Sequence, residues 1–235
     1  MNERKIYIVI SQTPTRFAKC IRKFGNIKFN HAAISFDKEL KQIYAFARPQ
    51  YYSYLLGHLV KESINSYTLN KDMQLQCMVF ELSVSIEEYQ TVRALVDTIR
   101  NDSEYMYNLF SVLTFPVTKG FEVYKAFTCI EFIVLILQQL GYSIEKPYYA
   151  YRPDDLMEIL HDYKIYEGDI RGILSKENID KEYFAPITME KRVESAVVFC
   201  KLCKRSIIRK PHYELVNQDY RNIMKQKELQ KVVEG

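Results

Sequence analysis

Two residues in this sequence, Cys129 and His31, have the types and the placement needed for thiol chemistry. Cys129 opens an apolar run that ends at Gly141, and Thr128 stands just before it. Thr128 is a predicted N-cap and Gly141 a predicted C′ residue, so the pattern predicts a buried helix with the cysteine in its first turn. The helix dipole and the unpaired N–H groups at that end favour thiolate over thiol. Cys129 is therefore a candidate nucleophile, although most free cysteines are simply small buried hydrophobes.

A thiol at this position becomes a nucleophile when an imidazole accepts its proton. Among the four histidines, His31 alone lies in the middle of a predicted strand, on a sheet that the Cys129 helix has to cover. The other histidines fall in an irregular segment, near a helix end and in the tail, at His58, His161 and His212. A strand histidine is often only a hydrogen-bonded core or surface residue. Paired with a cysteine at a helix start, it is also a candidate general base.

Alternating and helical hydrophobic patterns predict the elements that position these two residues. A capping box at Ser85 marks the start of one helix, and Pro153 at a first helical position marks another. The predicted strands cover residues 5–10, 29–36, 43–47, 77–84 and 163–166, and the predicted helices cover residues 16–24, 86–100, 105–115, 129–140, 153–160 and 189–206.

A long, tyrosine-rich connection over residues 48–74 has no clear pattern and is predicted to be irregular. Such a segment can form a lid or one wall of a substrate site. We therefore predict that Tyr51, Tyr52 and Tyr54 bind substrate.

Composition predicts a globular chain of 235 residues with a soft boundary near residue 185. Residues 186–235 hold eleven Lys/Arg against six Asp/Glu, which predicts a basic helical C-terminal extension following a domain over residues 1–185. Mixed charges of this kind usually form a solvated face, so no nucleic-acid partner is expected. Five cysteines without paired spacing, no signal peptide and no transmembrane segment favour the cytoplasm.

The order of the two motifs resembles a known superfamily. His31-Ala32-Ala33-Ile34 on the first strand of a hairpin, followed far downstream by Thr128-Cys129-Ile130-Glu131-Phe132, is similar to the circularly permuted YiiX-like branch of the NlpC papain-like cysteine peptidases. The resemblance covers about residues 5 to 166. It implies an α+β, papain-like fold, with an antiparallel sheet packed against a central Cys-bearing helix. It also implies that Cys129 is the nucleophile and His31 the general base in cleavage of an amide or ester bond.

One position departs from the pattern of that branch. Its members usually carry a polar residue on the second hairpin strand, facing the histidine. Here Ala45 or Ala47 is expected opposite His31, with Tyr44 or Ser35 as possible substitutes. We therefore expect the imidazole to be oriented by a carbonyl, a hydroxyl or water, and not by a carboxylate.

The predicted function is thiol-dependent hydrolysis of an amide bond in a small peptide-like or cell-wall-derived substrate, without a cofactor. A non-catalytic peptide or amino-acid binding module of the same fold is one alternative. A lipid acyltransferase of the lecithin retinol acyltransferase type is another, although such relatives carry a second histidine near the first and a membrane anchor. No metal site is predicted, because Cys200 and Cys203 lack a second Cys/His pair.

Overall fold

A six-stranded antiparallel sheet forms the centre of the computed structural model, which describes residues 3–69, 74–175 and 179–208. The strand order is β4-β3-β2-β1-β5-β8, and a separate two-stranded parallel ladder pairs β6 with β7. The strands are β1 Glu3–Ser11, β2 His31–Ser35, β3 Ile43–Ala47, β4 His58–Lys61, β5 Gln76–Ser85, β6 Met106–Tyr107, β7 Ala126–Phe127 and β8 Lys164–Asp169. The chain is therefore an α+β protein, as predicted.

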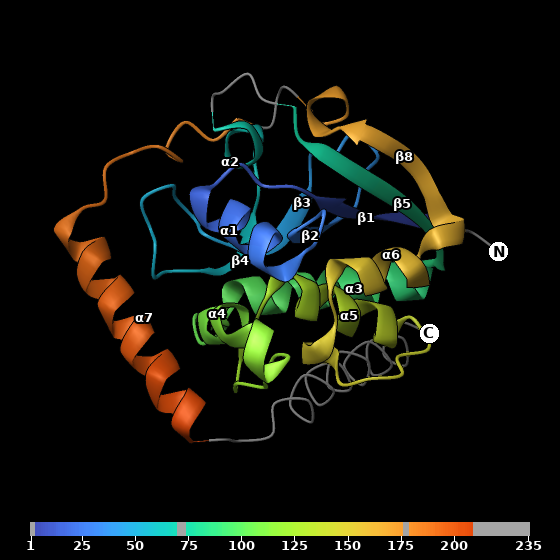
Figure 1. Cartoon of the computed structure of the whole chain (residues 1–235). Coiled ribbons are helices and arrows are strands. Elements are labelled where there is room, and N and C mark those ends of the chain that lie inside the picture. The colour runs from blue at the N-terminus through green and yellow to red at the C-terminus, as the bar shows by residue number, and fades with distance from the viewer. Residues whose placement is uncertain (1–2, 70–73, 176–178, 209–235) are drawn as a thin grey trace, which may run out of the picture.

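Helices α3, α4, α5 and α6 gather on one side of the sheet, while α2 lies on the other side (Figure 1). The helices are α1 Arg16–Gly25, α2 Ile64–Thr68, α3 Ile86–Asn101, α4 Leu109–Thr118, α5 Cys129–Gln139, α6 Pro153–Ile159 and α7 Met189–Ile207. Short 3-10 turns cover Tyr148–Ala150, His161–Tyr163 and Ile170–Gly172. Within the described residues, no helix combines the length and the apolar character needed to cross a membrane.

Helix α5 runs through the main core, as its apolar sequence predicts. Every side chain from Cys129 to Leu137 is buried, and the helix contacts β2 and β3. Phe132 packs edge-on against Phe46 of β3, with ring centroids 5.3 Å apart. Gly141 follows the helix with a φ of +81°, in the left-handed region that favours glycine. Both ends of the predicted helix are confirmed.

A smaller core lies on the opposite face of the sheet. Tyr7 and Val9 of β1 and Ala33 of β2 pack there with Tyr67 of α2 and Ile170. The sheet is thus apolar on both faces, which explains the buried character of β2 along its whole length.

Two predicted segments differ from the structure. Residues 48–74 were expected to be irregular, but they contain strand β4 and helix α2. Both elements are too short for a hydrophobic period to emerge, and they form because they pack on the sheet. The helix expected over residues 105–115 begins at Leu109, after the N-cap Asn108, and it includes Pro116. Pro116 lies in the last turn of this helix and supplies no backbone N–H to it.

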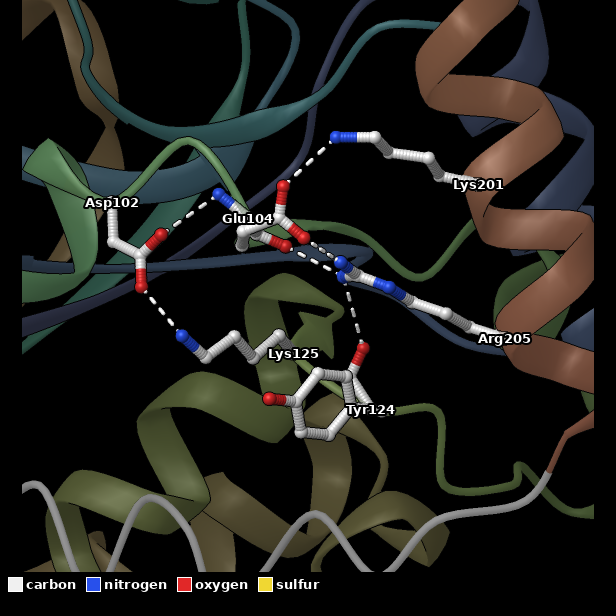
Figure 2. A network of polar contacts seen from close by, with 6 residues as sticks. All are labelled: Asp102, Glu104, Tyr124, Lys125, Lys201 and Arg205. Atoms are coloured by element: carbon white, nitrogen blue, oxygen red, sulfur yellow. Dashed lines mark hydrogen bonds and ion pairs between the residues drawn. The ribbon is translucent and has the colours of Figure 1, made fainter.

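Helix α7, within the predicted C-terminal extension, contacts the region just before α5. Leu202 is buried against Met106, Val123 and Ala126, which include residues of β6 and β7. Figure 2 shows Lys201 and Arg205 reaching from α7 to Glu104. Arg205 also donates hydrogen bonds to the backbone carbonyl of Glu104 at 2.7 Å and to that of Tyr124 at 3.3 Å. The boundary near residue 185 stays a prediction, and the described part of the extension packs on the preceding residues.

We predict that Arg205→Met lowers the free energy of unfolding by about 1.5–3 kcal/mol, because a largely buried guanidinium loses several charge-assisted hydrogen bonds. Lys201→Met is the matched control, since its ion pair with Glu104 is roughly half exposed. The control should cost about 0–1 kcal/mol. Urea unfolding of the two variants measures both values, and equal losses would contradict the assigned role of Arg205.

Candidate active site

Cys129 and His31 meet where the N-terminus of α5 reaches the beginning of β2. Cys129 is the first residue of α5, and His31 is the first residue of β2. Both side chains are buried, with exposed fractions of 5% and 6% for the residues. Both residues line the same cavity, and the Cys129 sulfur lies 4.0 Å from the carbonyl oxygen of Asn30, the residue that precedes His31. The structure therefore brings together the two residues that the sequence singled out.

A capping box holds the first turn of α5. The Glu131 backbone N–H donates to the Thr128 hydroxyl at 3.1 Å, and the Thr128 backbone N–H donates to the Glu131 carboxyl group at 2.8 Å. The other carboxyl oxygen of Glu131 accepts from the Ser111 hydroxyl at 2.8 Å. Burial raises the pKa of Glu131 to about 8, although the hydrogen bonds from Thr128, Ser111 and Asn108 partly offset this effect. Glu131 is thus predominantly neutral at pH 7, and it places little negative charge beside the thiol.

A carboxylate orients His31, contrary to the sequence-based expectation. The Nε2 atom of His31 lies 2.9 Å from a carboxylate oxygen of Glu62, which directly follows β4. The Tyr67 hydroxyl donates to the same oxygen at 2.5 Å. The expectation was wrong because it considered only the hairpin, whereas Glu62 directly follows β4, the strand paired with β3, within the segment expected to be irregular.

The proposed substitutes on the hairpin do not perform this role. The Ser35 hydroxyl donates to the carbonyl of Asp37 at 2.9 Å, and Tyr44 packs in the main core against Phe36. Ala45 and Ala47 offer no polar side-chain atom. Glu62 is therefore the residue that orients the ring, and because it engages Nε2, Nδ1 is the ring nitrogen that this contact does not use.

The electrostatics of His31 favour its protonated form. Burial of the imidazole works to lower its pKa, but the charges of Glu62 and Cys129 and the hydrogen bonds to both raise the pKa well above its ordinary value. A buried imidazolium between a carboxylate and a sulfur is stabilised from both sides.

A cavity of about 360 Å³ gives access to the two residues. Its lining includes Cys129, His31 and Glu62, side chains of α1 and α4, and part of the tyrosine-rich segment. Tyr54 lines the cavity and is 65% exposed, at its mouth. Tyr51 and Tyr52 are not among its lining residues; the Tyr51 ring packs against Tyr52 and Phe184. Substrate binding by the three tyrosines stays a prediction, with Tyr54 the one placed at the cavity.

Tyr107 of β6 is a cavity residue that sequence reasoning missed. Burial raises the pKa of its phenol well above the ordinary value, and the charges of Cys129 and Glu131 add to this rise. Its backbone N–H donates to the Gly57 carbonyl at 2.7 Å. A Cβ atom at Gly57 would lie only 2.6 Å from the Tyr107 Cβ, so glycine permits this close approach. The position of Tyr107 depends on this tertiary contact, for which the sequence carries no local signal.

The remaining candidate groups do not join the site. His58 lies on β4 and His161 in a 3-10 turn, while His212 lies outside the described residues. Cys200 is exposed on α7 and Cys203 is half-buried. Among the described residues, no group of three or more His, Cys, Asp or Glu side chains is arranged to hold a metal ion.

Comparison of the chain with protein-family models, curated proteins and solved structures finds no match.

We predict that Glu131→Gln makes the free energy of unfolding less sensitive to rising pH. The folded-state pKa of Glu131, about 8, lies above the ordinary value of 4.5, so the native state holds a proton that the unfolded chain releases in this range. Stability of the wild type is therefore lost as pH rises from about 4.5 to 8, by up to about 1.4 kcal/mol per pH unit. Urea unfolding across this range measures the free energy of unfolding of both proteins. The value for the wild type should fall relative to that of the variant as pH rises, and the difference should level off above pH 8.

Glu88→Gln provides the matched control, because Glu88 holds the equivalent capping-box position of α3 on the exposed surface. Subtracting its effect removes the contribution of replacing a capping glutamate. If the two substitutions give the same pH dependence, burial of Glu131 is not the cause.

Proposed function

We propose that this protein is a cysteine hydrolase that cleaves an amide bond in a small peptide-like or cell-wall-derived substrate. Cys129 acts as the nucleophile, His31 as the general base and acid, and Glu62 as the residue that orients His31. The observation that carries this proposal is that Cys129 lines the same cavity as His31, whose Nε2 atom lies 2.9 Å from the Glu62 carboxylate.

In this mechanism, His31 accepts the Cys129 proton, and the resulting thiolate attacks the carbonyl carbon of the substrate. The imidazolium then gives its proton to the leaving amine as the carbon–nitrogen bond breaks, which leaves an acyl group on the sulfur. A water molecule, deprotonated by His31, attacks the thioester carbonyl. Collapse of that second intermediate releases the acid and restores the thiol. Glu62 holds the ring throughout and stabilises its protonated form.

The N-terminus of α5 offers donors for the oxyanion that forms in each step. The capping box engages the backbone N–H groups of Thr128 and Glu131, which leaves those of Cys129 and Ile130 in the first turn. Fixed N–H dipoles in a buried site stabilise a developing oxyanion more strongly than water does.

The resemblance to the permuted NlpC-type peptidases supports the same proposal. In this chain the histidine strand precedes the cysteine helix, and α5 packs against β2 and β3 of an antiparallel sheet. We propose that this is a papain-like, circularly permuted arrangement. Glu62 then takes the orienting role that a residue of the second hairpin strand has in that branch.

The reactivity of Cys129 tests the proposal without a known substrate. Iodoacetamide should label Cys129 faster than Cys20, Cys77, Cys200 or Cys203 at about pH 6 to 7, because the mechanism proposed here requires a thiolate beside an imidazolium. His31→Ala should slow this labelling toward the rate of an ordinary thiol, since it removes the proton acceptor and the imidazolium. The rates are read as a pH series by mass spectrometry of the labelled peptides.

Access to the sulfur is checked in the same experiment. A limiting rate at high pH that matches an exposed cysteine shows that the reagent reaches Cys129. If Cys129 is reachable but its labelling rises only near about pH 8 to 9 and His31→Ala has no effect, the catalytic proposal fails. The protein is then better explained as a binding module of the same fold.

A second prediction concerns Glu62. Glu62→Gln should slow iodoacetamide labelling of Cys129 at about pH 6 to 7, because burial lowers the pKa of His31 and the substitution removes the Glu62 charge that opposes this effect. Tyr67→Phe keeps the carboxylate and removes only the hydrogen bond at 2.5 Å, so its effect should be smaller. An unchanged rate in Glu62→Gln would indicate that the ion pair is purely structural. Circular dichroism confirms that both variants are folded.

A further inference from the structure

The cavity beside Cys129 carries one feature that the reaction itself does not require, namely the guanidinium group of Arg48. We infer that Arg48 selects substrates that carry an anionic group, a carboxylate or phosphate, close to the bond that is cleaved. This inference rests on the proposed function, because it assigns a substrate class to the same site.

Arg48 is a half-buried lining residue of the cavity that also contains Cys129. Its Nη1 donates to the backbone carbonyl of Tyr51 at 3.0 Å, and its guanidinium carbon lies 5.8 Å and 5.6 Å from the ring centroids of Tyr51 and Tyr54. These contacts hold the side chain in place through one of its five N–H donors. Within the described part of the chain, they leave donors available to a ligand.

No carboxylate of the described residues forms an ion pair with Arg48. The acidic side chain in the cavity lining is Glu62, and it is already bound by His31 and Tyr67. Arg48 also acts on the interior of the site, because its charge lowers the pKa of Tyr107 against the larger raising effect of burial. The cation thus faces the same space as the reacting groups.

Much of the remaining wall is apolar, which strengthens the electrostatic effect of Arg48. Leu55, Leu56, Leu109 and Leu113 line the cavity, and Leu55 and Leu113 are 44% and 52% exposed. An apolar wall excludes water from a bound ligand and strengthens the attraction between opposite charges. A guanidinium in this setting favours a carboxylate or phosphate, which it can bind through two parallel hydrogen bonds.

Two reagents that differ only in charge near the reacting carbon test the inference. Iodoacetate carries a carboxylate and iodoacetamide a neutral amide, and both alkylate the same sulfur. In the wild type, the ratio of the iodoacetate rate to the iodoacetamide rate should be higher at Cys129 than at the exposed Cys200. Arg48→Gln should lower the ratio at Cys129 by about 3- to 10-fold, and raising the salt concentration should lower it in the wild type.

Two further variants separate charge from structure. Arg48→Lys keeps the positive charge and should retain much of the ratio, whereas a merely structural role for the guanidinium would slow both reagents alike. Arg4→Gln removes an equal charge from the exposed start of β1, outside the cavity lining, and should leave the ratio unchanged.

The outcomes distinguish this inference from the proposed function. Iodoacetamide labelling can show an activated Cys129 while the ratio of iodoacetate to iodoacetamide rates equals that of Cys200 and is unchanged by Arg48→Gln. In that case the anionic substrate class is overturned and the hydrolase proposal stands. If Cys129 is not activated in the wild type, both fail. A ratio that depends on Arg48 and on salt supports an anionic substrate.

Discussion

The burial of α5 is the constraint on which the site depends. Its side chains from Cys129 to Leu137 are all buried, so the helix has no solvent face and must be enclosed on every side. The sheet encloses it through β2 and β3, and the turn Tyr148–Ala150 contacts it elsewhere. Because apolar burial is the dominant favourable term in folding, this enclosure fixes the axis of the helix. Cys129 is then held where the helix begins, beside the start of β2.

Two buried glutamates near the thiol have different surroundings. Glu131 is bound by Thr128 and Ser111 within its own capping region, and burial raises its pKa to about 8. Glu62 faces His31, a partner that can carry the opposite charge. A neutral Glu131 does not oppose a thiolate, whereas Glu62 favours the imidazolium that accompanies one. The different neighbours of the two residues therefore give them different roles: Glu131 caps α5, and Glu62 orients His31.

Features with a local signal were predictable from the sequence, and features that depend on distant contacts were not. Thr128 and Gly141 mark the ends of α5, and Ser85 marks the start of α3, because capping requires particular residue types at fixed spacing. Glu62 was missed because β4 has only four residues, too few to show alternation. Its meeting with His31 depends on strand order, as does the approach of Arg48 to the cavity. A β3–β4 pairing cannot be deduced from either strand alone.

The placement of the His31–Glu62 pair favours a functional explanation over a structural one. Both side chains are at most 8% exposed, so forming the pair requires two charged groups to leave water. The cost of such desolvation often equals or exceeds the attraction, and well-packed apolar residues of similar size serve stability as well or better. The pair nevertheless lies beside the one cysteine at the start of a buried helix, and Tyr67 adds a hydrogen bond to it. In the proposed reaction, a costly pair at that position holds and charges the imidazole beside the cysteine nucleophile.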